Sequence, residues 1–540
     1  MKQTEPLVII AGAGPVGLAL ALGLSVQGVR SVVLERKAEL SKHSRAAGIL
    51  TRTLEIFKQW GVLAPFEDLG VRLRQAQVYR ADTNRPVATV NWELLADETA
   101  TPGILILPQG DTEALLLRWA TVHGRSEVHF GHEVTGFLQD ADGVSVMVQP
   151  PEGEPYTLRG TYLVGCDGAH SAVREQLGWH LEGKTYDTRF LLADVTLPDA
   201  RNDLPWPRFL PDDRGFEAAI RMSADVWRII APLVREQPDE DALATSALDR
   251  RVETLFGPGP YTHVWSSVFR IHCRTSPHFR SGRVLLAGDA AHLNSPVGGQ
   301  GMNGGIQDAH NLAWKLARAV SGGDAEPLLA SYEAERRAVV LNQIERTTDW
   351  ATRMLLLPAP RARALVARMI RAAIARPALM RRIARRMGML DQAYLHSPII
   401  TGAGHHLGQR APDGEVMDGD GYTVRLHDLV GPHALLVLFD DGRFPLWPPG
   451  QVENWVAGIP GVRVARVMPR SAQPATGWYW DGEARLWETY HAGVGTAVLI
   501  RPDGVVGWRG DRPSMDALMA GVAVGLGVPH APLPVRPSGH

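Results

Sequence analysis

The stretch Leu7–Gly17 reads LVIIAGAGPVG, and it decides the fold of this chain. Four apolar residues form a short strand, a glycine-rich turn follows, and an alanine- and leucine-rich helix begins at about Val16. A second apolar strand at residues 31–34 ends at an acidic residue, Glu35. Strand, tight turn, helix and strand in this order are typical of a unit buried in a parallel sheet.

The three glycines of this turn have separate physical tasks. The first permits the tight turn, the second lets backbone approach a pyrophosphate at the helix N-terminus, and the third lets helix and strand pack closely. Glu35 follows Gly17 by 18 residues, where its carboxylate can accept hydrogen bonds from a ribose. The candidate dinucleotide contacts are therefore Gly12, Gly14, Pro15, Gly17, Glu35 and Arg36.

Two later pieces favour FAD over NAD. One is GCDGAHS at residues 165–171, and the other is VLLAGDAAH at residues 284–292. The second piece places Asp289 at the carboxyl end of a strand, where open α/β sheets bind ligands. An aspartate there is by itself more often a helix N-cap. However, residues 298–305 hold five glycines before a helix, so backbone N–H groups could approach a flat ring.

Composition sets the broad class of the protein. The chain has 540 residues, enough for about three or four domains. With 45% hydrophobic residues, 21% charged residues and a net charge of −2, it has no global attraction to nucleic acid or membranes. The two cysteines, Cys166 and Cys273, form no metal-ligand or disulfide pattern. We therefore expect no metal site and a reducing, cytoplasmic location.

The N-terminus has a charge-free run between Glu5 and Arg30 that resembles a signal peptide or a membrane helix. The glycines at 12, 14 and 17 divide it into a short strand and a helix. We therefore predict no stable membrane insertion.

Further elements follow from apolar periodicity and turn residues. We expect helices at 52–59, 112–121, 302–320 and 327–346, antiparallel strands within 70–90, and a β-meander of 128–134, 144–149 and 156–159 that leads into a strand at 162–164. Residues 179–280 hold short strand-like runs, such as 190–196, 216–222 and 227–233, and predict an inserted antiparallel sheet. From residue 402 a small α/β domain begins, with strands at 433–439, 497–500 and 505–508 and a final helix at 513–525.

Residues 353–388 carry ten arginines and no acidic residue. Such a segment could bind an anionic membrane surface or nucleic acid. The alternative is a pair of linker helices, interrupted by prolines, with arginines on their solvent faces. We favour the linker because the rest of the chain has no basic excess.

The three pieces, in this order and at these intervals, resemble those of the single-component FAD-dependent aromatic hydroxylases typified by para-hydroxybenzoate hydroxylase. The resemblance spans about residues 7–345, and residues 402–540 more loosely resemble the thioredoxin-like tail of the phenol hydroxylase-like branch. This tail has no cysteine, so disulfide exchange is excluded there. The implied fold is α/β: a Rossmann-type FAD-binding domain, an inserted antiparallel β-sheet substrate domain, a helical linker and a thioredoxin-like C-terminal domain.

The implied domain boundaries are discontinuous. They are 1–75, 101–178 and 281–346 for the FAD-binding domain, 76–100 and 179–280 for the substrate domain, 347–400 for the Arg-rich linker, and 401–540 for the C-terminal domain.

The resemblance also assigns residues to parts of the cofactor. It places Arg45 at the phosphates, Gln109 near the flavin, Asp167 and Gly168 at FAD and the transient pyridine nucleotide, and Asp289 at the ribitol chain. It places Gly301, Met302 and Asn303 along the isoalloxazine edge and makes Pro296 a further cofactor-binding residue. More weakly, Arg221 matches an arginine near the mobile flavin and the substrate, although a surface salt bridge would explain it equally well.

The implied activity is a monooxygenase that consumes NADPH or NADH and hydroxylates a phenolic or polycyclic aromatic substrate with dioxygen, through a C4a-hydroperoxyflavin. We expect no nucleic-acid partner, and a homodimer is a possible assembly. No catalytic base is assigned, because His263, His272 and His278 of the inserted sheet are each more often structural or surface residues.

Other functions stay open on the same sequence. The fold also supports Baeyer–Villiger or ring-opening oxygenation, halogenation or reduction, although the halogenase signature Trp-x-Trp-x-Ile-Pro is missing. A non-catalytic FAD-binding scaffold is a further alternative, which the glycine loop at residues 298–305 disfavours.

Overall fold

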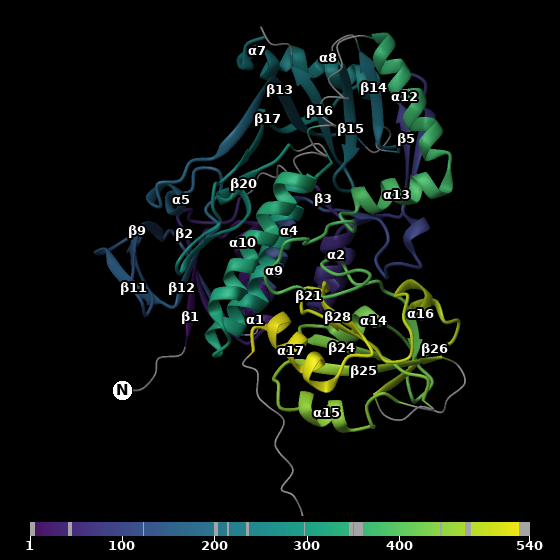
Figure 1. Cartoon of the computed structure of the whole chain (residues 1–540). Helices are drawn as coiled ribbons and strands as arrows, with labels where there is room; N and C mark the ends of the chain where they lie inside the picture. The colour runs from purple at the N-terminus through teal and green to yellow at the C-terminus, as the bar shows by residue number, and fades with distance from the viewer. Residues whose placement is uncertain are drawn as a thin grey trace, which may run out of the picture.

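The computed structural model describes residues 6–41, 46–122, 124–198, 203–212, 215–233, 237–295, 298–344, 349, 360–442, 445–469 and 477–528. Figure 1 shows three parts in a row: a large sheet with α7 and α8 at one end, a central α/β part, and a C-terminal unit around β24, β25 and α17 at the other end.

A six-stranded sheet forms the centre, in the order β18-β19-β12-β1-β2-β8. Its strands are β1 (Leu7–Ala11), β2 (Arg30–Glu35), β8 (Ser126–Phe130), β12 (Tyr162–Gly165), β18 (Arg280–Ser281) and β19 (Val284–Leu286). All pair in parallel except the edge strand β18. Ala11 lies opposite both Leu34 and Gly165, and Gly165 lies opposite Leu286. The carboxyl ends of β1, β12 and β19 therefore meet at one edge.

Helices pack on this sheet through close backbone contacts. They are α1 (Pro15–Val26), α2 (Thr51–Gln59), α3 (Leu63–Leu69), α4 (Gln109–Val122), α5 (Ala172–Gln176), α9 (Gln300–Val320) and α10 (Ala325–Val339), which runs on into η3 (Val340–Ile344). Residues Val16 to Ser25 of α1 are buried. A methyl group on Gly23 would lie 2.9 Å from the Ala313 side chain, so α1 and α9 approach closely only because Gly23 has no Cβ.

The expected strand at residues 128–134 is wrong. β8 ends at Phe130, Gly131 turns with φ +75°, and β9 begins at Glu133. β8 extends the central sheet, whereas the meander consists of β9 (Glu133–Gln139), β10 (Val144–Gln149) and β11 (Tyr156–Gly160). The apolar pattern runs through this turn, so periodicity alone could not divide the two strands.

The second large sheet has eight strands in the order β20-β17-β13-β16-β15-β14-β5-β6. They are β5 (Gln75–Arg80), β6 (Arg85–Asn91), β13 (Glu182–Thr196), β14 (Arg208–Asp212), β15 (Gly215–Arg221), β16 (Val226–Leu233), β17 (Thr262–Thr275) and β20 (His292–Leu293). Neighbours are antiparallel except β14 and β5. Helix α7 (Asp239–Leu243) and helix α8 (Thr245–Phe256) share one apolar core with one face of this sheet. A small sheet of β3 (Gly48–Ile49), β7 (Ile104–Ile106) and β4 (Val71–Leu73) completes the region.

The Arg-rich segment contains α12 (Pro360–Ile374) and α13 (Pro377–Met387). Met380 and Ala384 of α13 join a core with Trp92 and with Leu95 of the short helix η1 (Glu93–Leu95). A bare linker would have all its arginines on the solvent face. The arginines of α13 differ from this expectation. Arg381 bonds to Asp97 and Glu98, and Arg385 bonds to Glu98. These ion pairs attach α13 to the loop after η1.

The C-terminal sheet has the order β21-β28-β27-β24-β25-β26-β22-β23. Its strands are β21 (Thr401–Gly402), β22 (Glu415–Met417), β23 (Thr423–Arg425), β24 (Ala434–Phe439), β25 (Val462–Pro469), β26 (Trp478–Asp481), β27 (Thr496–Ile500) and β28 (Val506–Asp511), and its helices are α14 (Leu426–Val430), α15 (Gln451–Val456), α16 (Arg485–Thr489) and α17 (Met515–Leu526). β24 pairs in parallel with β25 and antiparallel with β27. β27 in turn pairs antiparallel with β28. This is the thioredoxin-like strand arrangement.

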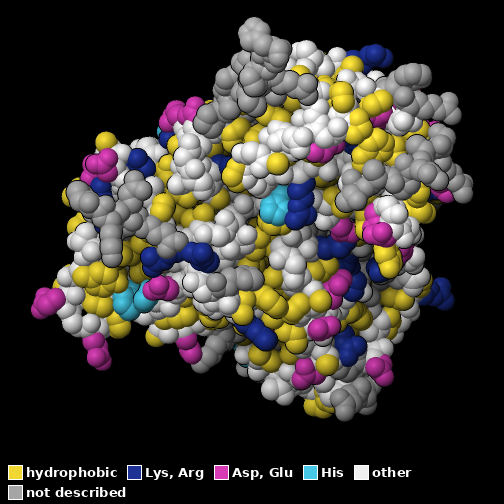
Figure 2. Space-filling model, turned by 90° about the horizontal axis from the view of Figure 1, so that it is seen from below, with side chains coloured by type: hydrophobic (Ala, Val, Ile, Leu, Met, Phe, Trp, Pro, Cys, Tyr) yellow, Lys and Arg dark blue, Asp and Glu magenta, His cyan; other side chains and the backbone are white. Residues whose placement is uncertain are grey.

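The molecular surface carries both signs of charge. On the face in Figure 2, acidic and basic side chains are interspersed among apolar ones. Among the described helices, none is long and apolar enough to cross a membrane.

Candidate functional site

The three sequence pieces meet at the carboxyl edge of the central sheet. The Gly12 N–H donates to Leu34 O at 2.8 Å, and the Cys166 N–H donates to Ala11 O at 2.8 Å. The Ala287 N–H donates to Gly165 O at 3.0 Å. Backbone bonds between neighbouring strands thus align the glycine turn, the Asp167 turn and the Asp289 turn.

The glycines of the first turn divide into two kinds. A Cβ on Gly12 would lie 2.5 Å from Cys166 O, and one on Gly17 would lie 2.0 Å from Gly12 O. Protein packing therefore requires these two glycines. In contrast, a Cβ on Gly14 would meet no other described part of the chain within 4 Å. The space in front of Gly14, at the N-terminus of α1, is open to a ligand.

Glu35 and Arg36 differ in their surroundings. The half-buried Glu35 carboxylate accepts hydrogen bonds from the Ala13 N–H at 2.8 Å and the Lys37 N–H at 2.9 Å. This carboxylate therefore lies against the glycine turn, whereas Arg36 is exposed.

Asp167 lies at the end of β12. One oxygen of its carboxylate accepts from the Val173 N–H at 3.1 Å, and the other is buried with no hydrogen-bond partner in the described chain. Burial raises the pKa of Asp167. Gly168 has φ +82° and open space at its Cβ position. This turn thus offers a carboxylate oxygen and room beside it.

Asp289 is exposed in the short helix η2 (Gly288–Ala290), directly after β19. Gly298 and Gly299 have φ +88° and +68°, a left-handed backbone that favours glycine. A Cβ on Gly301 would meet nothing within 4 Å in the described chain. Arg45 and Pro296 lie outside the described residues.

Asn303 is fully buried, and its side chain bonds to backbone. Its amide oxygen accepts from the Leu50 N–H at 2.9 Å, and its amide nitrogen donates to Gly48 O at 2.8 Å and Gly299 O at 2.7 Å. The side chain therefore ties β3 to the glycine loop, whereas neighbouring Met302 is half-buried in the first turn of α9.

Gln109 and Arg221 bond locally. The Gln109 amide donates to Glu113 at 2.8 Å and accepts from the Ala46 N–H at 3.3 Å, at the start of α4. The Arg221 guanidinium donates to Ser223 O and Ala224 O, in the turn between β15 and β16. A role of Arg221 toward substrate stays a prediction.

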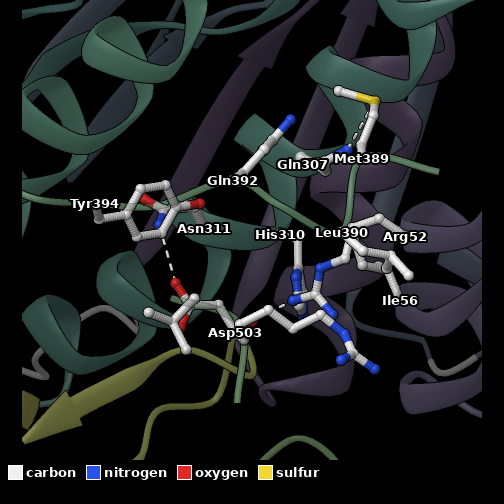
Figure 3. Close-up of a pocket in the computed structure, with 12 residues that line it drawn as sticks. Arg52, Ile56, Gln307, His310, Asn311, Met389, Leu390, Gln392, Tyr394 and Asp503 are labelled. Atoms are coloured by element: carbon white, nitrogen blue, oxygen red, sulfur yellow. Dashed lines mark hydrogen bonds between the residues drawn. The ribbon is translucent and has the colours of Figure 1, made fainter. Parts of the chain in front are cut away.

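A buried network of charged and amide side chains, which the sequence did not predict, joins α9, α10 and the C-terminal unit. Lys315 of α9 donates to Glu335 of α10 at 2.7 Å, and Arg501 of the C-terminal unit donates to the same carboxylate at 2.6 and 2.9 Å. Asn311 donates to Asp503 at 2.9 Å, as drawn in Figure 3. The cavity in Figure 3 has a volume of about 20 Å³ and lies at this junction. The signal was the polar stripe Asp308, Asn311 and Lys315 on an otherwise apolar helix.

Comparison with known proteins identifies the family. Residues 5–347 match the FAD binding domain family, and residues 405–529 match the C-terminal domain of aromatic-ring hydroxylases. The chain belongs to the FAD-dependent aromatic hydroxylases. This confirms the resemblance seen in the sequence and the fold class that it implied.

Several relatives of this hydroxylase are named as monooxygenases or hydroxylases of tetracycline precursors, rifampicin or aklavinone. A 12-dehydrotetracycline 5-monooxygenase/anhydrotetracycline 6-monooxygenase of Streptomyces rimosus is 37% identical over 77% of this chain and 81% of the relative. A rifampicin monooxygenase of Streptomyces venezuelae is 33% identical over 93% and 95%. The structure of aklavinone-11 hydroxylase with FAD and aklavinone is 25% identical, with a TM-score of 0.81 over 97% and 100% of the two chains.

This hydroxylase is therefore an FAD-dependent aromatic monooxygenase, with NAD(P)H as the co-substrate typical of the family. Its geometry fits the cofactor, because Gly14, Gly168 and Gly301 all border open space where a Cβ would obstruct a ligand.

Proposed function

We propose that this hydroxylase oxygenates a polycyclic aromatic compound held against the face of the eight-stranded sheet opposite α8. Four phenylalanines lie in the apolar cluster on this face: Phe190, Phe209, Phe216 and Phe269. Phe209 stacks on Phe216 with ring centroids 5.6 Å apart, and Phe190 lies 6.3 Å from Phe216. Phe209 and Phe269 remain half-exposed, so the face can bury a further apolar ring system.

This aromatic face is the observation that carries the proposal. Aromatic rings attract one another in offset or edge-on contact and gain further from burial of apolar area. A multi-ring substrate would span several of these phenylalanines, whereas a single phenol would contact one or two. The names of the relatives, which include tetracycline and aklavinone hydroxylases, support a multi-ring substrate.

The proposed cofactor contacts follow the geometry of the carboxyl edge. The Gly12–Gly17 turn and Arg45 would bind the pyrophosphate, and Glu35 and Arg36 would lie at the adenosine ribose. Asp167 and Gly168 would contact FAD and the pyridine nucleotide, and Asp289 would bind the ribitol. The residues around the flavin ring would be Gln109, Pro296, Gly301, Met302 and Asn303. For Asn303 we propose a contact through backbone, because its side chain already holds Gly48, Leu50 and Gly299.

Bound at this edge, FAD would supply the redox chemistry, in which NAD(P)H provides the electrons, one atom of dioxygen goes to the aromatic ring and the other leaves as water. The chain supplies position and exclusion of water. The α1 N-terminus and the Gly14 backbone favour the negative pyrophosphate. The phenylalanine face orients the ring and keeps water from the reacting atoms. We further propose a cytoplasmic enzyme, with a homodimer as one assembly.

The test is a paired panel of single-ring phenols and multi-ring phenolic polyketides, with NADH and NADPH in parallel. We expect multi-ring compounds to stimulate NAD(P)H oxidation more strongly and Phe209→Ala to weaken that preference. A stronger response to single phenols, unchanged in Phe209→Ala, would contradict the proposed substrate class.

A further inference from the structure

A chain of buried polar side chains runs beneath the loop between β19 and α9. Arg336 Nε donates to Asp308 at 2.6 Å, and Asp308 lies 2.7 Å from His292 Nε2. His292 Nδ1 lies 2.9 Å from the amide nitrogen of Asn294. Arg336, Asp308 and His292 are buried, and Asn294 is half-buried. The chain therefore joins α10, α9 and β20 to the start of the glycine loop.

The His292 ring has a polar neighbour at each nitrogen. Nε2 lies 2.7 Å from the Asp308 carboxylate, and Nδ1 lies 2.9 Å from the side-chain amide of Asn294. The ring also stacks on Phe279, with centroids 5.9 Å apart and planes at 20°. His292 is thus held in one orientation.

The same network fixes both ends of the loop. The Asp308 oxygen that meets His292 also accepts from the Gly288 N–H at 3.0 Å, directly before Asp289. Arg336 Nη2 donates to Gly304 O at 3.1 Å, near the N-terminus of α9. Asn294 lies between these two points. Buried hydrogen bonds therefore hold the backbone at Gly288 and Gly304, on either side of the proposed flavin contacts.

We infer that His292, held between Asp308 and Asn294, is a positioning residue for FAD: it holds the segment from Gly288 to Asn294 against α9 so that Asp289 and the Gly301 backbone meet the cofactor together. The inference rests on the proposed cofactor contacts. His292 does not reach the ligand side itself. It acts by joining a buried carboxylate to the loop, as a supporting hydrogen bond orients a residue that binds a ligand.

The first test substitutes His292→Gln. The glutamine side chain keeps an N–H donor for Asp308 and lacks the second ring nitrogen that faces Asn294. We expect the FAD dissociation constant of the apoprotein to rise about tenfold, or about 1.4 kcal/mol, and the visible absorption spectrum of the bound flavin to change shape. The matched control is His310→Gln, at a buried histidine of α9 whose ring lies edge-on to Trp60 and lines the cavity of Figure 3. It should leave both readouts at their wild-type values.

The second test substitutes Asn294→Leu, which keeps the approximate size of the side chain and removes the amide nitrogen 2.9 Å from His292 Nδ1. The FAD dissociation constant should rise as it does in His292→Gln, because the contact between the ring and the start of the loop is lost.

The outcomes separate the inference from the proposed function. Wild-type protein that binds FAD, with His292→Gln weakened and His310→Gln unchanged, supports the relay. Equal effects of the two histidine substitutions, or an Asn294→Leu variant that binds FAD as tightly as the wild type, would overturn it. Wild-type protein that takes up no FAD would overturn the cofactor contacts themselves, and the relay with them.

Discussion

At the scale of single residues, Gly14 separates the demands of folding from those of binding. Gly14 has φ −73°, which other residues adopt, and a Cβ there would meet no other described part of the chain within 4 Å. We therefore expect the Gly14→Val apoprotein to keep the melting temperature of the wild-type apoprotein. Its FAD dissociation constant should rise about tenfold or more, or at least about 1.4 kcal/mol. Fluorescence titration of the apoprotein with FAD measures this.

The matched control is Gly17→Val, whose Cβ would collide with Gly12 O at 2.0 Å. This variant should lose folded protein as well as FAD. If Gly14→Val bound FAD as tightly as the wild type, the pyrophosphate would not lie at this turn.

Which residues were predictable from sequence depends on whether their partners are local. Gly12, Gly17 and Glu35 belong to one strand–turn–helix unit, whose spacing alone fixes their relation. Glu335 and Asp308 were missed because their partners come from other elements, among them Arg501, which lies 166 residues beyond Glu335. Asn303 at the flavin edge stays a prediction, and the hydrogen bonds of its side chain to backbone groups of Gly48 and Leu50 could not be predicted because those residues are far away in sequence.

At the scale of elements, Glu335 is the centre of the joint between α9, α10 and the C-terminal unit. Burial opposes its ionisation, but Arg501 and Lys315 hold the pKa of Glu335 well below its ordinary 4.5. We expect Glu335→Gln to lower the free energy of unfolding by about 3–5 kcal/mol at neutral pH, because it leaves the buried Lys315 without its carboxylate and Arg501 with Asp503 alone. Urea denaturation measures this loss.

The control lies on the same helix. Glu326 of α10 pairs with Arg280, but its side chain is 77% exposed. Glu326→Gln should cost less than about 1 kcal/mol, as surface ion pairs do. Equal losses in the two variants would contradict the importance of the buried joint.

The same carboxylate predicts a dependence of stability on pH. Because the folded-state pKa of Glu335 lies below its unfolded value, its contribution is present above about pH 4.5 and is lost as pH falls toward the folded-state pKa. Wild-type stability should therefore fall below pH 4.5, and Glu335→Gln should fall less. Urea midpoints at pH 7, 4.5 and 3.5 test this, and identical slopes would contradict it.

Elements were predictable where one apolar run equals one strand or helix. The first strand, α2 and α9 follow this rule. The turn at Gly131 broke it, because apolar residues continue on both sides of a single left-handed glycine. The packing of α13 against Asp97 and Glu98 could not be predicted from the sequence either, because these acidic residues lie 283 or more residues before Arg381.

At the scale of the whole molecule, the C-terminal unit is joined to the FAD-binding part by buried ion pairs. Arg410 bonds to Glu55 of α2, and Arg501 bonds to Glu335 of α10. Because separation would expose unpaired charges on both sides, we expect one cooperative thermal transition, with FAD release at the same temperature. Calorimetry read beside flavin fluorescence tests this. Two resolved transitions would show that the units fold independently.

The central claim is that this chain is an FAD-dependent aromatic monooxygenase. The direct measurement supplies the FAD-loaded protein with NAD(P)H, a multi-ring phenol and isotopically heavy dioxygen, and analyses the product by mass spectrometry. The account predicts a product that gains one heavy oxygen atom, with substrate-dependent consumption of NAD(P)H and dioxygen. A product without that atom, or no dioxygen consumption with any aromatic compound, would contradict it.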